Sequence, residues 1–120
     1  MSYEFGDIIL VSFPFTDLST KKVRPTLVIS YKDLSKEDLI VAAISSRVTD
    51  KLTETEFLIE REASYFSQTG LKVASVIKSD KISTIDSKIV GKKIGKLSDE
   101  VKNKIHKIIC KMWRCIEVGG

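Results

Sequence analysis

The chain of 120 residues has one histidine, two cysteines, two prolines and one tryptophan. A single histidine, His106, excludes a nuclease built on two catalytic histidines, and no group of cysteines and histidines has the spacing of a zinc site. A glycine-rich phosphate loop and a GxSxG nucleophile elbow are also absent from the sequence. The chemistry that remains depends on arginine, lysine, serine and carboxylate side chains.

Long hydrophobic runs are missing as well. No apolar segment approaches the ~20 residues that span a bilayer, and the first five residues carry Glu4 where a secretory signal carries bases. Cys110 and Cys115 are five positions apart in an expected helix, so they face different sides and are expected to be reduced thiols. We therefore expect a cytoplasmic protein without membrane contact, folded as one domain over residues 1–120.

The net charge of +4 is unevenly distributed along the sequence. Residues 88–114 contain nine bases and two acids, whereas residues 32–62 contain five bases and eight acids. A basic surface of this kind suits a polyanionic partner, although a solvated lysine-rich helix face gives the same pattern. Charge alone does not choose between the two interpretations.

Most of the chain has the pattern of short β-strands. The run from Asp7 to Phe13 is β-branched and apolar enough to be buried on both faces. A polar loop follows as far as Lys22, and Pro25 leads into the next strand. The expected strands are 7–13, 26–30, 39–45, 55–60, 73–77 continued by 81–85 after a bend, and 89–94, the last a Lys- and Gly-rich edge.

Two helical segments are predicted. Residues 62–70 form a linker with room for one helical turn that ends at Gly70. Ser98 is a favourable N-cap for a longer C-terminal helix, because acidic residues occupy the first turn that follows it. The apolar stripe of that helix runs from Val101 to Ile116 and includes Trp113, which we expect in the core. Together these elements predict a mainly β fold, an SH3-like antiparallel β-barrel with a C-terminal α-helix.

The candidate functional residues lie at strand ends. Arg24 precedes a proline and offers a fork of donors that matches a phosphate, although its spacing alone equally fits a structural arginine. The segment Ser45-Ser46-Arg47 adds two hydroxyls and a second guanidinium. Lys78 and Asp80 are two residues apart and are expected on one face of a strand. The spacing of the aspartates at 7, 17, 80 and 86 gives no sign of a magnesium site, so neither a metal nor a cofactor is predicted.

Three blocks in order resemble the PemK/MazF family of toxin–antitoxin ribonucleases. The first joins Gly6-Asp7-Ile8-Ile9-Leu10-Val11 to Arg24-Pro25-Thr26-Leu27-Val28-Ile29-Ser30, the second is Val41-Ala42-Ala43-Ile44-Ser45-Ser46, and the third runs from Ser75 to Asp86. A closing amphipathic helix is similar too. Ser83 departs from the pattern, since many family members have arginine there, and the loop Pro14-Phe15-Thr16-Asp17 also differs.

The resemblance implies a set of site residues. By position, Arg24, Ser45 and Asp80 match catalytic residues, with Asp80 as the base. A second set is expected to bind RNA, namely Ser46, Arg47, Lys78, Thr16 and Lys22. Arg24 matches the residue assigned as the acid, but a guanidinium gives up a proton reluctantly, so we expect its main effect to be electrostatic.

The resemblance also implies the reaction and the partners. In the implied reaction, which needs no metal, the 2′-hydroxyl of RNA attacks the adjacent phosphorus and leaves a 2′,3′-cyclic phosphate and a 5′-hydroxyl. The implied assembly is a homodimer that binds single-stranded RNA and is blocked by a cognate antitoxin. Two alternatives remain, a CcdB-type gyrase-binding toxin that cuts nothing and a degenerate family member that only binds nucleic acid.

Overall fold

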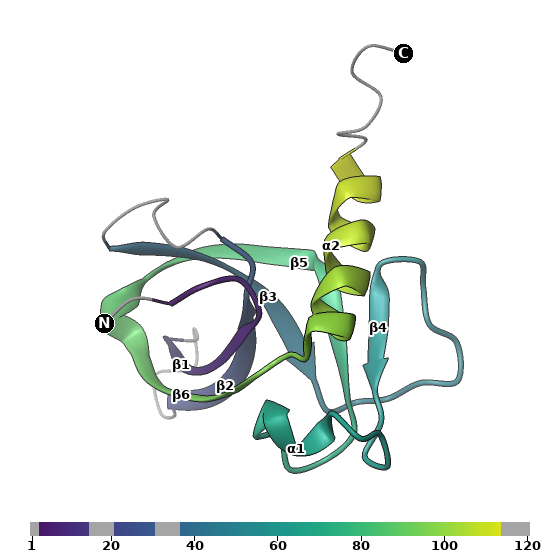
Figure 1. The fold of residues 1–120 in the computed structure, drawn as a ribbon. Coiled ribbons are helices and arrows are strands. Elements are labelled where there is room, and N and C mark those ends of the chain that lie inside the picture. The colour runs from purple at the N-terminus through teal and green to yellow at the C-terminus, as the bar shows by residue number, and fades with distance from the viewer. Residues whose placement is uncertain (1–2, 15–20, 31–36, 114–120) are drawn as a thin grey trace.

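The computed structural model describes residues 3–14, 21–30 and 37–113 (Figure 1). Six strands form one antiparallel sheet in the order β4-β5-β3-β2-β1-β6. The strands are β1 (Asp7–Pro14), β2 (Lys21–Val28), β3 (Asp38–Ser45), β4 (Glu56–Ile59), β5 (Ser75–Asp86) and β6 (Val90–Lys96). The helices are α1 (Phe66–Thr69) and α2 (Asp99–Trp113), and η1 (Ser87–Ile89) is a single 3-10 turn between β5 and β6.

The sheet curls strongly around its own inner face (Figure 1). Among the described strands no backbone pairing joins β4 to β6, so the sheet stays open where a closed barrel would have a seam. The predicted mainly β class with a C-terminal helix is confirmed, and the short, Lys- and Gly-rich β6 is an edge strand as expected. Within the described ranges, no helix has both the length and the apolarity that crossing a membrane requires.

Two apolar clusters lie on opposite faces of the sheet, and β1 contributes to both. Ile8 belongs to the cluster between the sheet and α2, whereas Ile9 and Val11 belong to the second cluster. Successive side chains of a strand point to opposite faces, so an unbroken apolar run is required where both faces are covered. The prediction that this first strand is buried on both sides is confirmed.

The long helix begins as predicted. The Val101 amide donates a hydrogen bond of 3.3 Å to the Ser98 hydroxyl, which caps the helix. Val101 and Ile105 are fully buried against the sheet. The expectation that Trp113 lies in the core is wrong: its side chain is 66% exposed, because the last turns of α2 extend past the strands (Figure 1). Cys115 lies outside the described residues.

β2 begins five residues earlier than predicted, at Lys21 in place of Thr26. The last two residues of the expected polar loop, Lys21 and Lys22, pair with β1, and the pairing continues to Pro25, which lies opposite Leu10. The proline is tolerated because β2 pairs with β3 only from Thr26 onward, so at Pro25 the strand is paired on one side. β2 and β3 therefore separate at this point.

A close backbone contact holds α1 against β6. A Cβ at Gly95 would collide with the backbone of Gln68 and Thr69, and one at Gly70 would collide with the carbonyl of Ile94. Gly70 also has a φ of 72°, the left-handed conformation that ends many helices. The predicted single turn ending at glycine is confirmed, and it lies directly beside the edge strand.

Candidate active site

The separation of β2 from β3 opens two hollows in the surface. Arg24, Pro25 and Ile44 line both of them, so these residues form the boundary that the hollows share. The smaller has a volume of about 360 Å³ and the larger about 890 Å³. The strand pairing that ends at Thr26 thus places Arg24 next to open space on both sides.

The smaller hollow lies on one face of β2, β3 and β5. Its lining comprises Arg24, Pro25, Thr26, Val41, Ala43, Ile44, Ser45, Lys78, Lys81 and Ser83. The strand register explains why these residues meet. Thr26 lies opposite Ala43 and Ala43 lies opposite Lys78, so the three share a face across three strands. Arg24 and Ser45 are two residues further along their strands on that face.

An irregularity in β5 decides which polar side chains reach this hollow. Ala42 pairs with Ile82 and Ala43 with Lys78, so residues 79–81 have no partner in β3. An odd number of inserted residues reverses the alternation of side chains along the strand. Lys81 and Ser83 consequently line the same hollow as Lys78, which strict alternation from Lys78 does not allow.

The same irregularity separates Asp80 from Lys78. Asp80 is exposed and is not among the residues that line either hollow. The expectation that the two share one face assumed an uninterrupted strand, and the insertion at residues 79–81 removes that condition. Asp80 instead lies at the bend, close along the chain to two lysines of the lining.

The smaller hollow is strongly cationic. Arg24, Lys78 and Lys81 belong to its lining, and none of the lining residues is acidic. Within the part of the chain that the structure describes, the ammonium groups of Lys78 and Lys81 form no ion pair. The buried Thr26 hydroxyl has no hydrogen-bond partner among the described residues. A site with this charge and shape favours an anionic group such as a phosphate.

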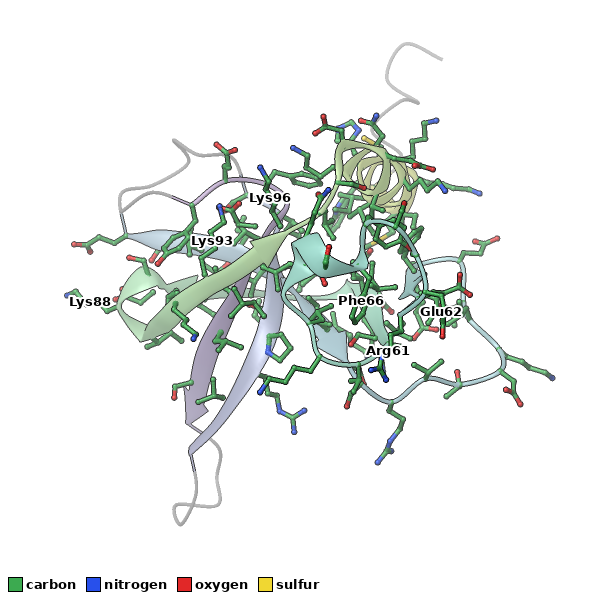
Figure 2. All side chains as sticks on the ribbon, turned by 60° about the horizontal axis from the view of Figure 1, so that its bottom comes forward. Arg61, Glu62, Phe66, Lys88, Lys93 and Lys96 are labelled. Carbon is green, nitrogen blue, oxygen red and sulfur yellow. The ribbon has the colours of Figure 1, made fainter. Side chains whose placement is uncertain are left out.

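The larger hollow combines an apolar lining with basic side chains. Leu10, Leu71, Val73 and Ile94 contribute apolar surface, and the basic members besides Arg24 are Lys72, Lys92 and Lys93. Lys93 is partly neutralised, since its Nζ lies 3.0 Å from Oδ1 of the buried Asp7. Figure 2 shows Lys93 and Lys96 on β6 and Lys88 just before it, in η1, so the first part of the basic segment seen in the sequence lies on and beside this edge strand.

The remaining predicted RNA-binding residues are placed as follows. Ser46 lines the larger hollow, whereas Arg47 is exposed and lines neither. The Arg47 amide donates a 3.1 Å hydrogen bond to the Ser45 hydroxyl, which orients that hydroxyl at the end of β3. Thr16 lies outside the described residues. Lys22 belongs to β2 opposite Phe13, and its side chain is outside the described part of the structure.

Sequence reasoning did not select Lys81 or Thr26 as site residues. Thr26 follows Arg24 by two positions in a strand, and this spacing was a usable signal. Lys81 gave no such signal, because its orientation depends on an insertion that appears only when β5 pairs with β3. Asp7 and Asp86, considered for a metal, have structural contacts: Asp7 pairs with Lys93, and Asp86 accepts a hydrogen bond from the Lys88 amide.

Comparison with models of protein families shows to which family the chain belongs. The family model of the PemK-like, MazF-like toxins of type II toxin–antitoxin systems matches residues 4–113. The chain belongs to this family. The resemblance predicted from the three sequence blocks is thereby confirmed, and the match includes Arg24, Ser45 and Lys78. No curated protein sequence gives a significant match.

Solved structures of MazF toxins have the same fold. The toxin MazF-mt6 of Mycobacterium tuberculosis is 21% identical, with a TM-score of 0.69 over 90% of this chain and 96% of its own. A MazE-MazF structure from Deinococcus radiodurans is 15% identical, with a TM-score of 0.70 over 94% and 96%. An endoribonuclease from a mycobacterial species, solved in complex with its cognate antitoxin, is 17% identical, with a TM-score of 0.65 over 91% and 92%.

Proposed function

We propose that this chain is the endoribonuclease toxin of a toxin–antitoxin system and that it cleaves single-stranded RNA selectively by sequence. The observation that carries the proposal is the meeting of Arg24, Ser45 and Lys78, from three different strands, at one cationic hollow. Membership of a toxin family and the MazF fold support the same activity. The proposed site of action is the cytoplasm, where the RNA substrate is found.

The proposed reaction uses the RNA's own nucleophile. The 2′-hydroxyl gives its proton to a base and attacks the adjacent phosphorus. The bond to the 5′-oxygen of the next nucleotide breaks, that oxygen takes up a proton, and a 2′,3′-cyclic phosphate and a 5′-hydroxyl result. Negative charge develops on the phosphoryl oxygens, and Arg24 and Lys78 stabilise it at the hollow. Protein cations of this kind take the part that a metal ion has in other nucleases, so the reaction is proposed to need no metal.

Asp80 is the proposed base. A base has to reach the 2′-hydroxyl, which belongs to the ribose next to the scissile phosphate, so the base is expected beside the phosphate-binding residues. Asp80 is exposed next to the cationic lining, so its carboxylate is accessible to a nucleotide bound at the rim. The Ser45 hydroxyl, held by the Arg47 amide, is proposed to bind a phosphoryl oxygen.

Two partners complete the proposal. The first is a cognate antitoxin, which is supported by the relatives solved with an antitoxin or with MazE. The second is another copy of the chain. The support for a homodimer is Trp113, on helical turns that project beyond the sheet, which offers the largest exposed hydrophobic side chain among the described residues as a contact surface.

The experiment that tests the function is incubation of the purified protein with RNA in the presence of EDTA. Fragments ending in 2′,3′-cyclic phosphate are expected. Absence of cleavage both in EDTA and with added divalent metal would contradict the proposal. In that case, inhibition of gyrase would indicate a CcdB-type poison, and RNA binding alone would indicate a family member without catalysis.

A further inference from the structure

The wall that β5 contributes to the cationic hollow contains two lysines and one serine. Lys78 lies before the inserted residues, and Lys81 and Ser83 lie at or after them. Ser83 is a short neutral side chain, so the charge on this wall comes from the lysines alone. Arg24 approaches from β2, on the opposite side of β3 in the sheet order.

Lys81 has no structural function that accounts for its position. Its side chain is exposed, it forms no ion pair among the described residues, and it is part of the lining of the hollow. An unpaired ammonium is more stable in water than in a concave site beside other cations, because like charges repel. Three cations with no carboxylate in the lining therefore favour a ligand with more than one negative oxygen.

We infer that Lys81 is a phosphate-binding residue of this site, holding the scissile phosphodiester together with Arg24 and Lys78. The inference rests on the proposed ribonuclease function and adds a residue to its site. The insertion at residues 79–81 is what provides this cation, since it turns the side chain of Lys81 toward the hollow and leaves Asp80 outside the lining. The flexible stem of lysine allows its ammonium to follow a phosphate as the geometry at phosphorus changes.

The test is a binding measurement that does not depend on cleavage. The probe is a single-stranded oligonucleotide with the bases of RNA but 2′-deoxy sugars throughout, so it lacks the attacking hydroxyl and keeps the phosphates. Lys81→Met keeps most of the side-chain volume and removes the charge. We expect affinity to fall about tenfold, as for one lost charge-assisted contact, and the slope of log K against log salt to decrease by about 0.7.

Lys88→Met is the matched control. Lys88 is exposed like Lys81 and follows the end of β5, but it does not line the hollow (Figure 2). We expect its affinity to stay within about twofold of the original, because one distant surface charge has a small effect in salt. Equal losses in the two variants would mean that Lys81 acts only through net charge, which would overturn the inference.

A second variant separates phosphate binding from a structural effect. Position 83 lines the same hollow as Lys81, so Ser83→Arg places a new cation at that hollow. We expect the double variant Lys81→Met, Ser83→Arg to recover most of the lost affinity and the lost salt slope. Lack of recovery in a folded double variant would contradict a shared phosphate.

The outcomes also separate this inference from the proposed function. If the native protein never cleaves RNA but Lys81→Met still lowers affinity and salt slope, the ribonuclease proposal fails while the phosphate site stands. If the native protein cleaves RNA and Lys81→Met changes neither binding nor cleavage, the inference about Lys81 is wrong while the ribonuclease proposal stands.

Discussion

The pairing of β2 with its neighbouring strands determines where Arg24 lies. It lies one residue before Pro25, at the point where β2 is paired to β1 but no longer to β3. Arg24 therefore lines both hollows. The donors of its guanidinium match the geometry of a phosphate, the ligand proposed for the smaller hollow. The end of the pairing between β2 and β3 therefore both opens the hollows and leaves Arg24 exposed beside them.

Replacement of Arg24 by alanine is the first prediction. Growth inhibition by the expressed protein is expected to be lost, with RNA cleavage reduced by a factor of about 10² or more, as for removal of one transition-state charge contact. The free energy of unfolding should change by less than about 0.5 kcal/mol, because the side chain is exposed. Growth assays, cleavage rates and urea unfolding provide the readouts.

Arg61→Ala is the control for this substitution. Arg61 is exposed before α1 and lines neither hollow (Figure 2). Its loss is expected to leave toxicity intact. A folded Arg24→Ala protein that remained toxic would remove Arg24 from the proposed mechanism.

Asp80→Asn is the second prediction. The amide cannot accept a proton from the 2′-hydroxyl, so the cleavage rate is expected to fall by about 10²-fold, the usual contribution of a general base. Binding of the all-deoxy oligonucleotide should be unchanged or slightly tighter, because a negative charge beside Lys78 and Lys81 is lost. Unchanged cleavage would show that the base is a different group.

The sequence predicted the polar residues of the site better than their arrangement. Arg24, Ser45 and Lys78 were selected and do line one hollow. Their catalytic and binding roles stay predictions. Lys81 was missed, and Asp80 was expected beside Lys78 but does not line the hollow. The insertion in β5 interrupts side-chain alternation there, and it is defined by pairing with β3 rather than by local sequence.

At the scale of elements, strand positions followed from apolar patterning with one exception. β1, β3 and β6 lie close to the predicted ranges, and the bend expected near residues 79–80 coincides with the irregularity in β5. β2 was predicted too short because its first residues are mostly polar. Backbone hydrogen bonds to β1 stabilise this segment as a strand despite its composition, an effect of tertiary contacts that local patterning does not contain.

The contact between α1 and β6 gives the third prediction. Gly95→Ala is expected to lower the free energy of unfolding by about 1–3 kcal/mol, because the added methyl collides with the backbone of α1. Gly91→Ala is the matched control in the same strand, since a Cβ there lies 3.5 Å from the Leu10 carbonyl oxygen, an ordinary contact. Equal unfolding free energies in urea for the two variants would contradict the close packing.

At the scale of the whole molecule, the end of α2 differs from the rest of the helix. Val101 and Ile105 pack against the sheet, whereas Trp113 is largely exposed. The apolar stripe predicted the helix correctly. It did not predict how many of the apolar side chains of the helix the sheet buries, because that number depends on where the sheet ends. This uncovered tryptophan is the described feature that best fits the proposed homodimer.

Trp113→Glu is the prediction at this scale. The native protein is expected to sediment at twice the 13.5 kDa mass of the chain, and the variant at the mass of one chain, because a buried charge destabilises an apolar interface. Val48→Glu is the control, since Val48 is 43% exposed in the segment between β3 and β4. A dimer that persists in Trp113→Glu would place the interface on another surface.

In the proposed reaction the cationic hollow directs an attack by the 2′-hydroxyl of RNA. The most direct measurement compares two oligonucleotides in EDTA, identical except for a 2′-deoxy sugar in the nucleotide 5′ of the mapped cut. We expect the all-ribose oligonucleotide to be cut to a 2′,3′-cyclic phosphate, and the substituted one to be bound with similar affinity but to stay intact. Cleavage of the substituted oligonucleotide at the same bond would contradict the proposed reaction.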